Sequence, residues 1–190
     1  QELSVTASGN HFTLEKPFFV LATQNPIEQE GTYPLPEAQL DRFMFNIWLD
    51  YPSFDDEVAI VKNTTIDKAE KLENILDGNE IMYFQELIRK IPVSDNVYKY
   101  AVELAAKTRP NTDRGTELAT KYLNWGAGPR ASQYLIIGAK THAALNGKYS
   151  PDIEDVQAVA LSILRHRIVK NYIAEAENIG IEDIIGELIK

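Results

Sequence analysis

The sequence contains no cysteine and no apolar run long enough to cross a bilayer. The absence of cysteine excludes disulfides, thiol catalysis and cysteine-ligated zinc or iron–sulfur centres. A membrane-spanning helix requires roughly 20 successive apolar residues, so we expect no membrane insertion. A chain without cysteine is compatible with a reducing compartment, and we expect a cytoplasmic location.

Basic residues are scarce relative to acidic ones. The 190 residues include 19 Lys and Arg against 28 Asp and Glu, which gives a formal net charge of −9. Such a charge repels a phosphate backbone, so nucleic acid is not expected as a direct ligand. Hydrophobic residues make up 44% of the chain, which is enough for a buried core and excludes a disordered tail. The chain opens on Gln1 rather than Met, and we expect it to be part of something longer.

The first fifty residues have an α/β pattern. Residues 3–14 predict a β-hairpin with Gly9 and Asn10 at its turn. Residues 17–22 lack polar alternation, which is typical of a strand covered on both faces of a parallel sheet. A proline-rich loop follows, then a short helix at 37–42 and a second buried strand at 43–49. Two such strands need neighbours that fifty residues cannot supply, so a larger domain or partner chains must complete the sheet.

Helical periodicity replaces the strands after residue 52. Apolar spacing predicts helices around residues 55–61, 82–88, 97–105 and 131–145, and a short one at 181–190. Asn146-Gly147 predicts a helix end, and Asp152 favours a new helix start just after Pro151. The prediction is therefore an α/β plus all-α chain. Residues 1–51 are predicted to form a piece of a parallel α/β sheet, and residues 52–190 a helical domain.

Asn25 and Arg42 stand where ligand chemistry is common. Asn25 follows the first buried strand, at the edge where open α/β sheets bind ligands, and its amide can orient water or contact phosphate. The alternative is a simple turn. Arg42 carries a planar guanidinium that suits phosphate, and an arginine supplied by a neighbouring subunit can stabilise the charge that develops during phosphoryl transfer. Its alternative is a surface ion pair with one of three nearby acidic residues, Glu37, Asp41 and Glu57.

Arg130 is the third candidate. Two glycines and Pro129 precede it at a predicted helix start, where backbone N–H groups and the helix dipole both favour an anion. An arginine there can add a charge-assisted hydrogen bond to phosphate. A solvated loop that merely enters a helix remains the alternative.

Other polar and aromatic residues are interpreted structurally. Arg165, His166 and Arg167 lie near a helix end, where cations offset the dipole. No second histidine stands at metal-ligand spacing from His11 or His142, so no metal site is predicted. Three glutamates of the proline-rich loop are interpreted as loop surface or a subunit contact: Glu28, Glu30 and Glu37. Four large aromatic residues are expected in the core: Phe18, Phe19, Trp48 and Trp125.

Together these segments closely resemble the MoxR family of AAA+ ATPases. Residues 22–43 resemble the family's stretch from sensor 1 to the arginine finger. Residues 128–132 resemble its sensor 2, and residues 164–168 resemble a stretch near the end of its lid. The resemblance covers essentially the whole chain. It implies the fold of a P-loop NTPase, with the last part of the parallel α/β core followed by a helical lid.

The resemblance also implies roles. Asn25 is similar to the sensor 1 residue that helps to position the attacking water. Arg42 is similar to the arginine finger that reaches the nucleotide of the adjacent subunit, and Arg130 to the sensor 2 arginine that contacts nucleotide from the lid. The family uses ATP with Mg²⁺ and forms rings, usually hexamers. It acts in chaperone-like maturation or activation of partners, often proteins with a von Willebrand factor A domain.

The sequence departs from the family at one point. No G-x-x-x-x-G-K-[ST] phosphate-binding loop occurs in these residues, nor an acidic run ending an apolar strand to hold Mg²⁺. We therefore expect the intact parent to hydrolyse ATP and this chain alone to be inactive, without tightly bound nucleotide. Two alternatives remain: a nucleotide-independent helical interaction module, and a chelatase-like or DNA-linked AAA+ branch that shares the sensors. The acidic balance argues against the DNA-linked branch, and the glutamate-rich loop favours MoxR over chelatase.

Overall fold

A computed structural model describes residues 3–24, 35–66 and 73–190. The chain divides into two compact units, residues 1–18 with 47–82 and residues 19–46 with 83–190. Each unit is described by itself. The predicted boundary near residue 51 refers to the parts of the family's fold, and it stays a prediction.

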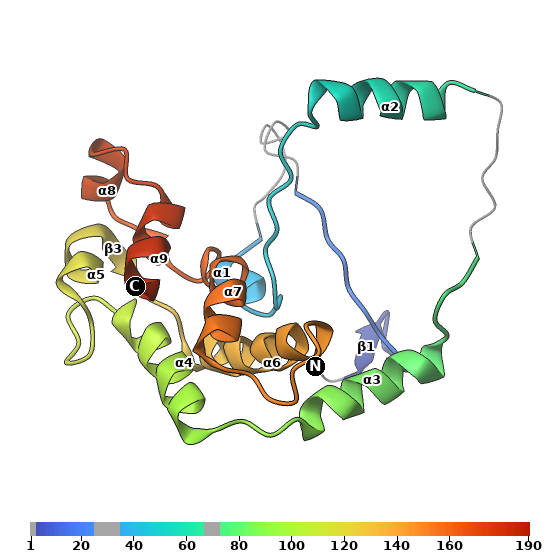
Figure 1. The fold of residues 1–190 in the computed structure, drawn as a ribbon, viewed down its shortest axis with the longest axis horizontal. Coiled ribbons are helices and arrows are strands. Elements are labelled where there is room, and N and C mark those ends of the chain that lie inside the picture. Colours follow the sequence, from blue (N-terminus) through green and yellow to red (C-terminus); the bar gives the residue numbers. More distant parts are fainter. Residues whose placement is uncertain (1–2, 25–34, 67–72) are drawn as a thin grey trace. The chain divides into compact units, whose positions relative to one another are not determined.

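The first unit contains a two-stranded hairpin and a capped helix (Figure 1). Strands β1 (Ser4–Ala7) and β2 (Asn10–Thr13) pair antiparallel, as predicted. Their two-residue turn is Ser8-Gly9, one position earlier than expected, and both residues have positive φ (51° and 81°) as a type I′ turn requires. Helix α2 (Phe54–Thr64) begins at the cap Ser53, whose hydroxyl accepts a hydrogen bond from the backbone N–H of Asp56 (3.3 Å). The division between the units falls within α3 (Gly78–Lys90).

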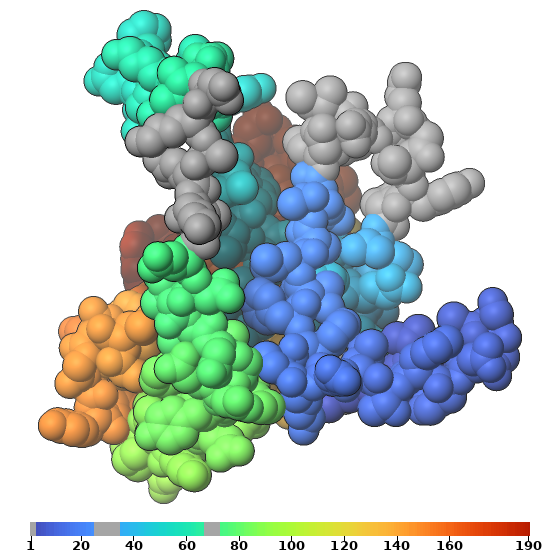
Figure 2. All heavy atoms as spheres, turned by 90° about the vertical axis from the view of Figure 1, so that its right-hand side faces the viewer, coloured from blue at the N-terminus to red at the C-terminus, as the bar shows by residue number. Residues whose placement is uncertain are grey.

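The two buried strands predicted at 17–22 and 43–49 do not form. Residues 18–24 and 45–50 have no regular structure. A strand needs a neighbour for its backbone hydrogen bonds, and no described segment pairs with either of these. The expected core positions of the four aromatic residues are also wrong: Phe18, Phe19, Trp48 and Trp125 are 50%, 78%, 67% and 68% exposed. Figure 2 draws all heavy atoms as spheres, with the N-terminal residues in blue.

The second unit is built around four helices that contact one another (Figure 1). They are α4 (Asp95–Lys107), α6 (Pro129–Leu145), α7 (Ile153–Leu164) and α9 (Ile181–Ile189). Around them lie α1 (Glu37–Leu40), α5 (Glu117–Tyr122), α8 (Tyr172–Ala176), and the strand pair β3 (Leu123–Trp125) and β4 (Val169–Lys170). These bounds confirm the helices predicted at 37–42, 131–145, after Pro151 and at 181–190. None of the helices in the described residues is long and apolar enough to cross a membrane.

Close packing of α6 on α7 forms the centre of this core. Four residues of α6 recur every fourth position and are fully buried: Ala131, Leu135, Ala139 and Ala143. A Cβ added at Gly138 would lie 3.1 Å from Val159 and 3.2 Å from Ile163, so this glycine permits the approach of the two helices. The second unit therefore carries its own core.

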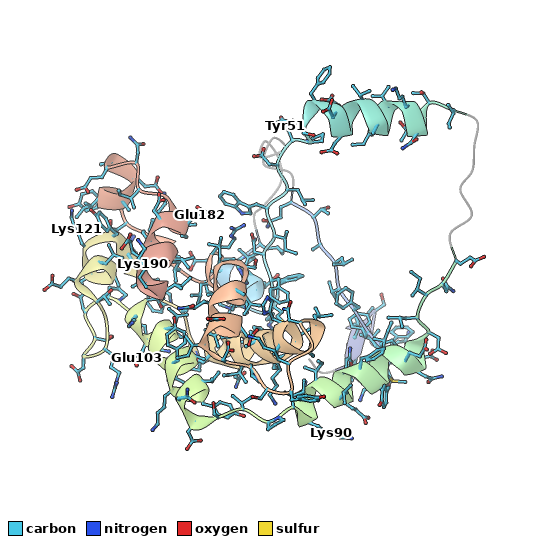
Figure 3. All side chains as sticks on the ribbon, in the orientation of Figure 1. Tyr51, Lys90, Glu103, Lys121, Glu182 and Lys190 are labelled. Carbon is cyan, nitrogen blue, oxygen red and sulfur yellow. The ribbon has the colours of Figure 1, made fainter. Side chains whose placement is uncertain are left out.

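Three hydrogen bonds and an ion pair hold the outer helices of this unit. The Tyr100 hydroxyl on α4 and the Gln157 amide on α7 both donate to the carbonyl oxygen of Ile189 (3.1 and 3.2 Å), which fixes the end of α9. Lys121 on α5, labelled in Figure 3, lies 3.3 Å from Glu177 after α8, and the Tyr122 hydroxyl donates to the same carboxylate (2.7 Å). These bonds thus hold α9 against α4 and α7, and hold α5 to the end of α8.

Asp155 forms a buried polar centre between the end of α6 and the start of α7. It is fully buried and accepts hydrogen bonds from the backbone N–H of Asp152 (2.9 Å), from His142 Nδ1 (2.7 Å) and from Lys148 Nζ (3.1 Å). Burial alone raises the pKa of Asp155, but these hydrogen bonds outweigh burial and lower that pKa to about 2. The fold therefore favours the ionised carboxylate.

We predict that Asp155→Asn lowers the free energy of unfolding of the chain by roughly 2 to 4 kcal/mol at pH 7, because donors are left facing an amide in a buried site. Urea unfolding followed by circular dichroism measures this. The wild-type contribution is present above the unfolded pKa of 3.8 and is lost as the pH falls toward 2, since the folded pKa is the lower one.

The matched control is Asp183→Asn. Asp183 occupies the same third position in α9 and bonds the Gly180 backbone N–H (3.0 Å), but it is exposed. Its substitution is expected to cost less than about 1 kcal/mol. Equal losses in both variants would contradict a special role for the buried Asp155 centre.

Candidate functional site

Arg42 lies directly after α1, in a turn whose backbone is held while its side chain is exposed. Its backbone N–H donates to the Gln39 carbonyl (3.1 Å), and its own carbonyl accepts from the Tyr134 hydroxyl on α6 (3.1 Å). Within the described parts of the chain, the Arg42 guanidinium has no hydrogen bond or ion pair. The alternative of a surface ion pair with Glu37 or Asp41 is therefore not supported by the structure.

Arg130 is the second residue of α6 and pairs with the residue that precedes Arg42. Its Nη1 donates to Asp41 Oδ2, and both side chains are about a third exposed (32% and 30%). Helix α6 starts with Pro129 in its first turn, and Gly128 at the N-cap offers no side-chain acceptor. The first N–H groups of α6 are thus without a side-chain cap beside a cationic side chain, as an anion site needs.

The loop that leads into Arg130 is fixed by the end of α4. The fully buried Thr108 hydroxyl accepts the Ala127 N–H (2.8 Å), and Arg109 Nε donates to the Ala127 carbonyl (2.9 Å). A Cβ on Gly126 would lie 2.3 Å from the Thr108 carbonyl oxygen, so only glycine fits this approach. These contacts fix the backbone of the loop from which helix α6 and Arg130 begin.

Arg167 joins the segment around Arg42 to the helical core. It is 5% exposed and donates from Nε to Asp41 Oδ1 (3.0 Å) and from Nη2 to the carbonyl oxygens of Asp41 (2.9 Å) and Phe43. Nη1 donates to the carbonyl oxygens of Met44 (3.3 Å) and Ile163. Burial lowers the pKa of Arg167, and the charge of Asp41 opposes that shift.

The interpretation of residues 165–167 as helix-capping cations is thus right only in part. The bond to Ile163 caps the last turn of α7, but the other bonds of Arg167 cross to residues 41–44. Arg165 lies 3.6 Å from Glu182 on α9, a residue labelled in Figure 3. Sequence reasoning missed Asp41 and Tyr134 as well. One signal was available for Tyr134, because it follows Arg130 by four residues and so shares its face of α6.

His166 adds a neutral donor to the contact between Arg167 and residues 41–44. Its Nε2–H donates to the Phe43 carbonyl (3.1 Å), and its Nδ1 is buried without a hydrogen-bond partner in the described residues. Burial lowers the pKa of His166 to about 4, and the Arg167 cation adds to the shift. The Asn46 N–H also donates to the Ser162 carbonyl (2.9 Å), so residues 41–46 are docked along the end of α7.

The structure therefore brings two of the three predicted site residues into one cluster. Arg130 pairs with Asp41, and Arg42 is the next residue in the chain. Asn25 lies outside the described residues, as do Glu28 and Glu30. Glu37 is exposed at the start of α1, in keeping with its interpretation as surface.

We predict that the stability of the chain falls as the pH drops from 6.5 to about 4, because the folded pKa of His166 lies below its unfolded value of 6.5. The stabilisation of the neutral ring is complete above pH 6.5. His166→Gln keeps an amide donor but has no ring to protonate, and we expect about 2 kcal/mol less loss across this range. Urea unfolding at several pH values, with an NMR titration of the ring, measures both effects. Protonation of folded His166 near pH 6.5 would contradict the prediction.

Two family models match separate parts of the chain. The model described as "ATPase family associated with various cellular activities (AAA)" matches residues 1–45, which include Arg42. The model described as "AAA lid domain" matches residues 116–188, which include Arg130 and Arg167. The matches therefore divide the candidate site between a core segment and a lid.

Relatives match along the whole chain. "Chaperone MoxR1" of Mycobacterium tuberculosis is 36% identical over 190 residues, covering 100% of this chain and 50% of the relative. "Uncharacterized protein YeaC" of Bacillus subtilis is 35% identical over 190 residues, covering 100% of this chain and 57% of the relative. The chain thus spans about half the length of these relatives.

A solved structure has the same fold. The crystal structure of a candidate ATPase from Cytophaga hutchinsonii superposes with a TM-score of 0.90 at 39% identity, covering 99% of this chain and 57% of that chain. The predicted fold class, part of a P-loop NTPase followed by a helical lid, is confirmed by this likeness and by the two family models. With matches to a core segment, a lid and MoxR relatives over every residue, the chain belongs to the MoxR-like AAA+ ATPases and corresponds to their C-terminal portion.

Proposed function

We propose that this chain is the sensing and arginine-finger portion of an ATPase that couples ATP binding and hydrolysis to chaperone-like maturation or activation of partner proteins. The name of the MoxR1 relative, a chaperone, supports the second half of this proposal. The first half depends on the site itself.

The observation that carries the proposal is the shared carboxylate of Asp41. It pairs with Arg130 and with Arg167, and it directly precedes Arg42, so it brings the two candidate arginines, Arg42 and Arg130, into one cluster. One of them is exposed and has no partner in the described residues, and the other stands at a helix N-terminus that lacks a side-chain cap. A surface ion-pair network has no need of either feature.

These residues fit a nucleotide phosphate. Arg130 and the first N–H groups of α6 would bind phosphate oxygens of the nucleotide in the same subunit. Arg42, projecting from its fixed turn, would reach the nucleotide of the adjacent subunit and offset the charge that develops during phosphoryl transfer. Bound ATP with Mg²⁺ supplies the phosphoanhydride bond that is cleaved. By resemblance, Asn25 would orient the attacking water.

The exposure of Arg42 supports action between subunits. A guanidinium that makes no hydrogen bond or ion pair with the described residues of its own chain is available to a neighbour, and a ring, by resemblance a hexamer, would give every nucleotide one such arginine. A protein with a von Willebrand factor A domain is the partner class we propose. The net charge of −9 disfavours nucleic acid as a ligand.

We predict that Arg42→Ala in the intact ATPase lowers kcat by roughly 1,000-fold or more while the nucleotide Kd changes little, because the lost guanidinium acts on charge that develops in the transition state. Steady-state turnover and nucleotide titration measure the two quantities. Arg114→Ala, which removes an exposed arginine between α4 and α5, is the matched control and should leave both unchanged. If nucleotide binding collapses in Arg42→Ala, the proposed action on a neighbouring subunit is wrong.

We predict that the 190-residue chain alone neither binds ATP tightly nor hydrolyses it, because its sequence has no phosphate-binding loop to supply the main phosphate contacts. Isothermal titration with ATP and Mg²⁺ and a phosphate-release assay test this. Tight, Mg²⁺-dependent binding with turnover by this chain would show that its residues form a complete nucleotide site of another kind.

A further inference from the structure

Three successive carbonyl groups around Arg42 are each bonded by a side chain of the lid. Arg167 donates to the carbonyl oxygens of Asp41 and Phe43, and Tyr134 donates to that of Arg42 between them. His166 adds a second donor to the Phe43 carbonyl. The peptide groups on both sides of Arg42 are therefore held, while its own side chain remains exposed.

Arg167 makes most of these contacts at once. One planar guanidinium reaches the Asp41 carboxylate, three carbonyl oxygens of residues 41–44 and the end of α7, the helix that precedes it. The ring of Tyr134 lies 5.0 Å from its central carbon. A lysine ammonium has the same charge but lacks the rigid fork, so it cannot make these bonds together.

Such an arrangement exceeds what helix capping requires. A capping cation needs only the last carbonyl groups of the helix that it caps, which here means that of Ile163 in α7. The remaining N–H groups of Arg167 donate to a turn that lies 123 to 126 positions earlier in the sequence. That turn has no strand partner in the described residues. The N–H groups of Arg42 and Phe43 bond to carbonyl oxygens of α1, whereas the carbonyl groups of residues 41–43 depend on the lid side chains.

We propose that Arg167 is a positioning residue for the reaction: it fixes the backbone from which Arg42 is presented to the nucleotide of the adjacent subunit. This inference rests on the proposed function of Arg42. Arg167 is nearly fully buried and acts through residues 41–44 rather than on nucleotide. A displacement of about 1 Å in a reacting group can cost roughly 100-fold in rate, so a loosened turn has a kinetic effect.

The test uses Arg167→Met and Arg167→Lys in the intact ATPase. We expect kcat to fall by roughly 100-fold in both variants, because both lose the fork, while the nucleotide Kd changes by less than about twofold. Lys170→Met is the matched control. Lys170 is also a partly buried cation of the lid that donates to a carbonyl, that of Ile179 (3.1 Å), and it should keep kcat within about twofold.

Mixed rings then separate positioning of Arg42 from general damage. Each Arg167→Met subunit is combined with a subunit whose phosphate-binding loop is inactivated but whose Arg42 is intact. Where the second subunit presents Arg42 to the nucleotide of the first, the site is complete, so turnover should rise at least roughly tenfold above either variant alone. Damage to the subunit's own nucleotide site cannot be repaired in this way.

The outcomes are distinct. Loss of kcat with retained binding and recovery in mixed rings supports the proposal. Unchanged kcat, loss of nucleotide binding, full activity of Arg167→Lys or no recovery in mixed rings overturns it. If Arg167→Met does not fold, as judged by circular dichroism, Arg167→Lys keeps the charge beside Asp41 and carries the same measurements. If Arg42→Ala itself retains turnover, the proposed function fails, whatever Arg167 does.

Discussion

The ion pair between the buried Arg167 and the partly exposed Asp41 is the interaction on which the candidate site depends. Burying a guanidinium costs several kcal/mol unless its charge is paired and its N–H groups are bonded. Here the charge meets Asp41, and the remaining donors meet carbonyl oxygens. Those carbonyls belong to residues that lack a strand partner, so Arg167 supplies their hydrogen-bond donors and they supply its acceptors. Neither the cation nor the turn would be satisfied alone.

One consequence is that the turn carrying Arg42 is attached to the lid. Arg130 and Tyr134 reach it from one face of α6, and His166 and Arg167 reach it from the end of α7. A change at Arg130, such as the exchange of Asp41 for a phosphate, would therefore be felt one residue from Arg42. Asp41, which pairs with Arg130 and directly precedes Arg42 in the chain, is the physical link between these two arginines.

The helices could be predicted from the sequence because their signals are local. Asp152 and Gly147 mark helix ends within a few residues of themselves, and each functions as expected. Arg42 and Arg130 were identified because their flanking residues form recognisable motifs. The pairing of Asp41 with Arg167 could not be predicted, because it joins positions 126 apart and a charged residue near a helix end suggests solvent contact.

The wrong strands have a different cause. A continuous apolar run such as 17–22 indicates burial, but it does not identify the segment that buries it. In the lid, the partners of each apolar face lie within the same 108 residues from 83 to 190. Helix α6 therefore packs on α7 and α4, and the predicted helices form. For residues 18–24 and 45–50 no described strand forms a ladder of backbone hydrogen bonds, and side chains with core composition remain exposed. Residues 41–44 differ because the side chains of Tyr134, His166 and Arg167 supply donors in place of a strand. Apolar composition thus indicates that a segment needs another segment to bury it, and only the structure shows which segments are paired in this way.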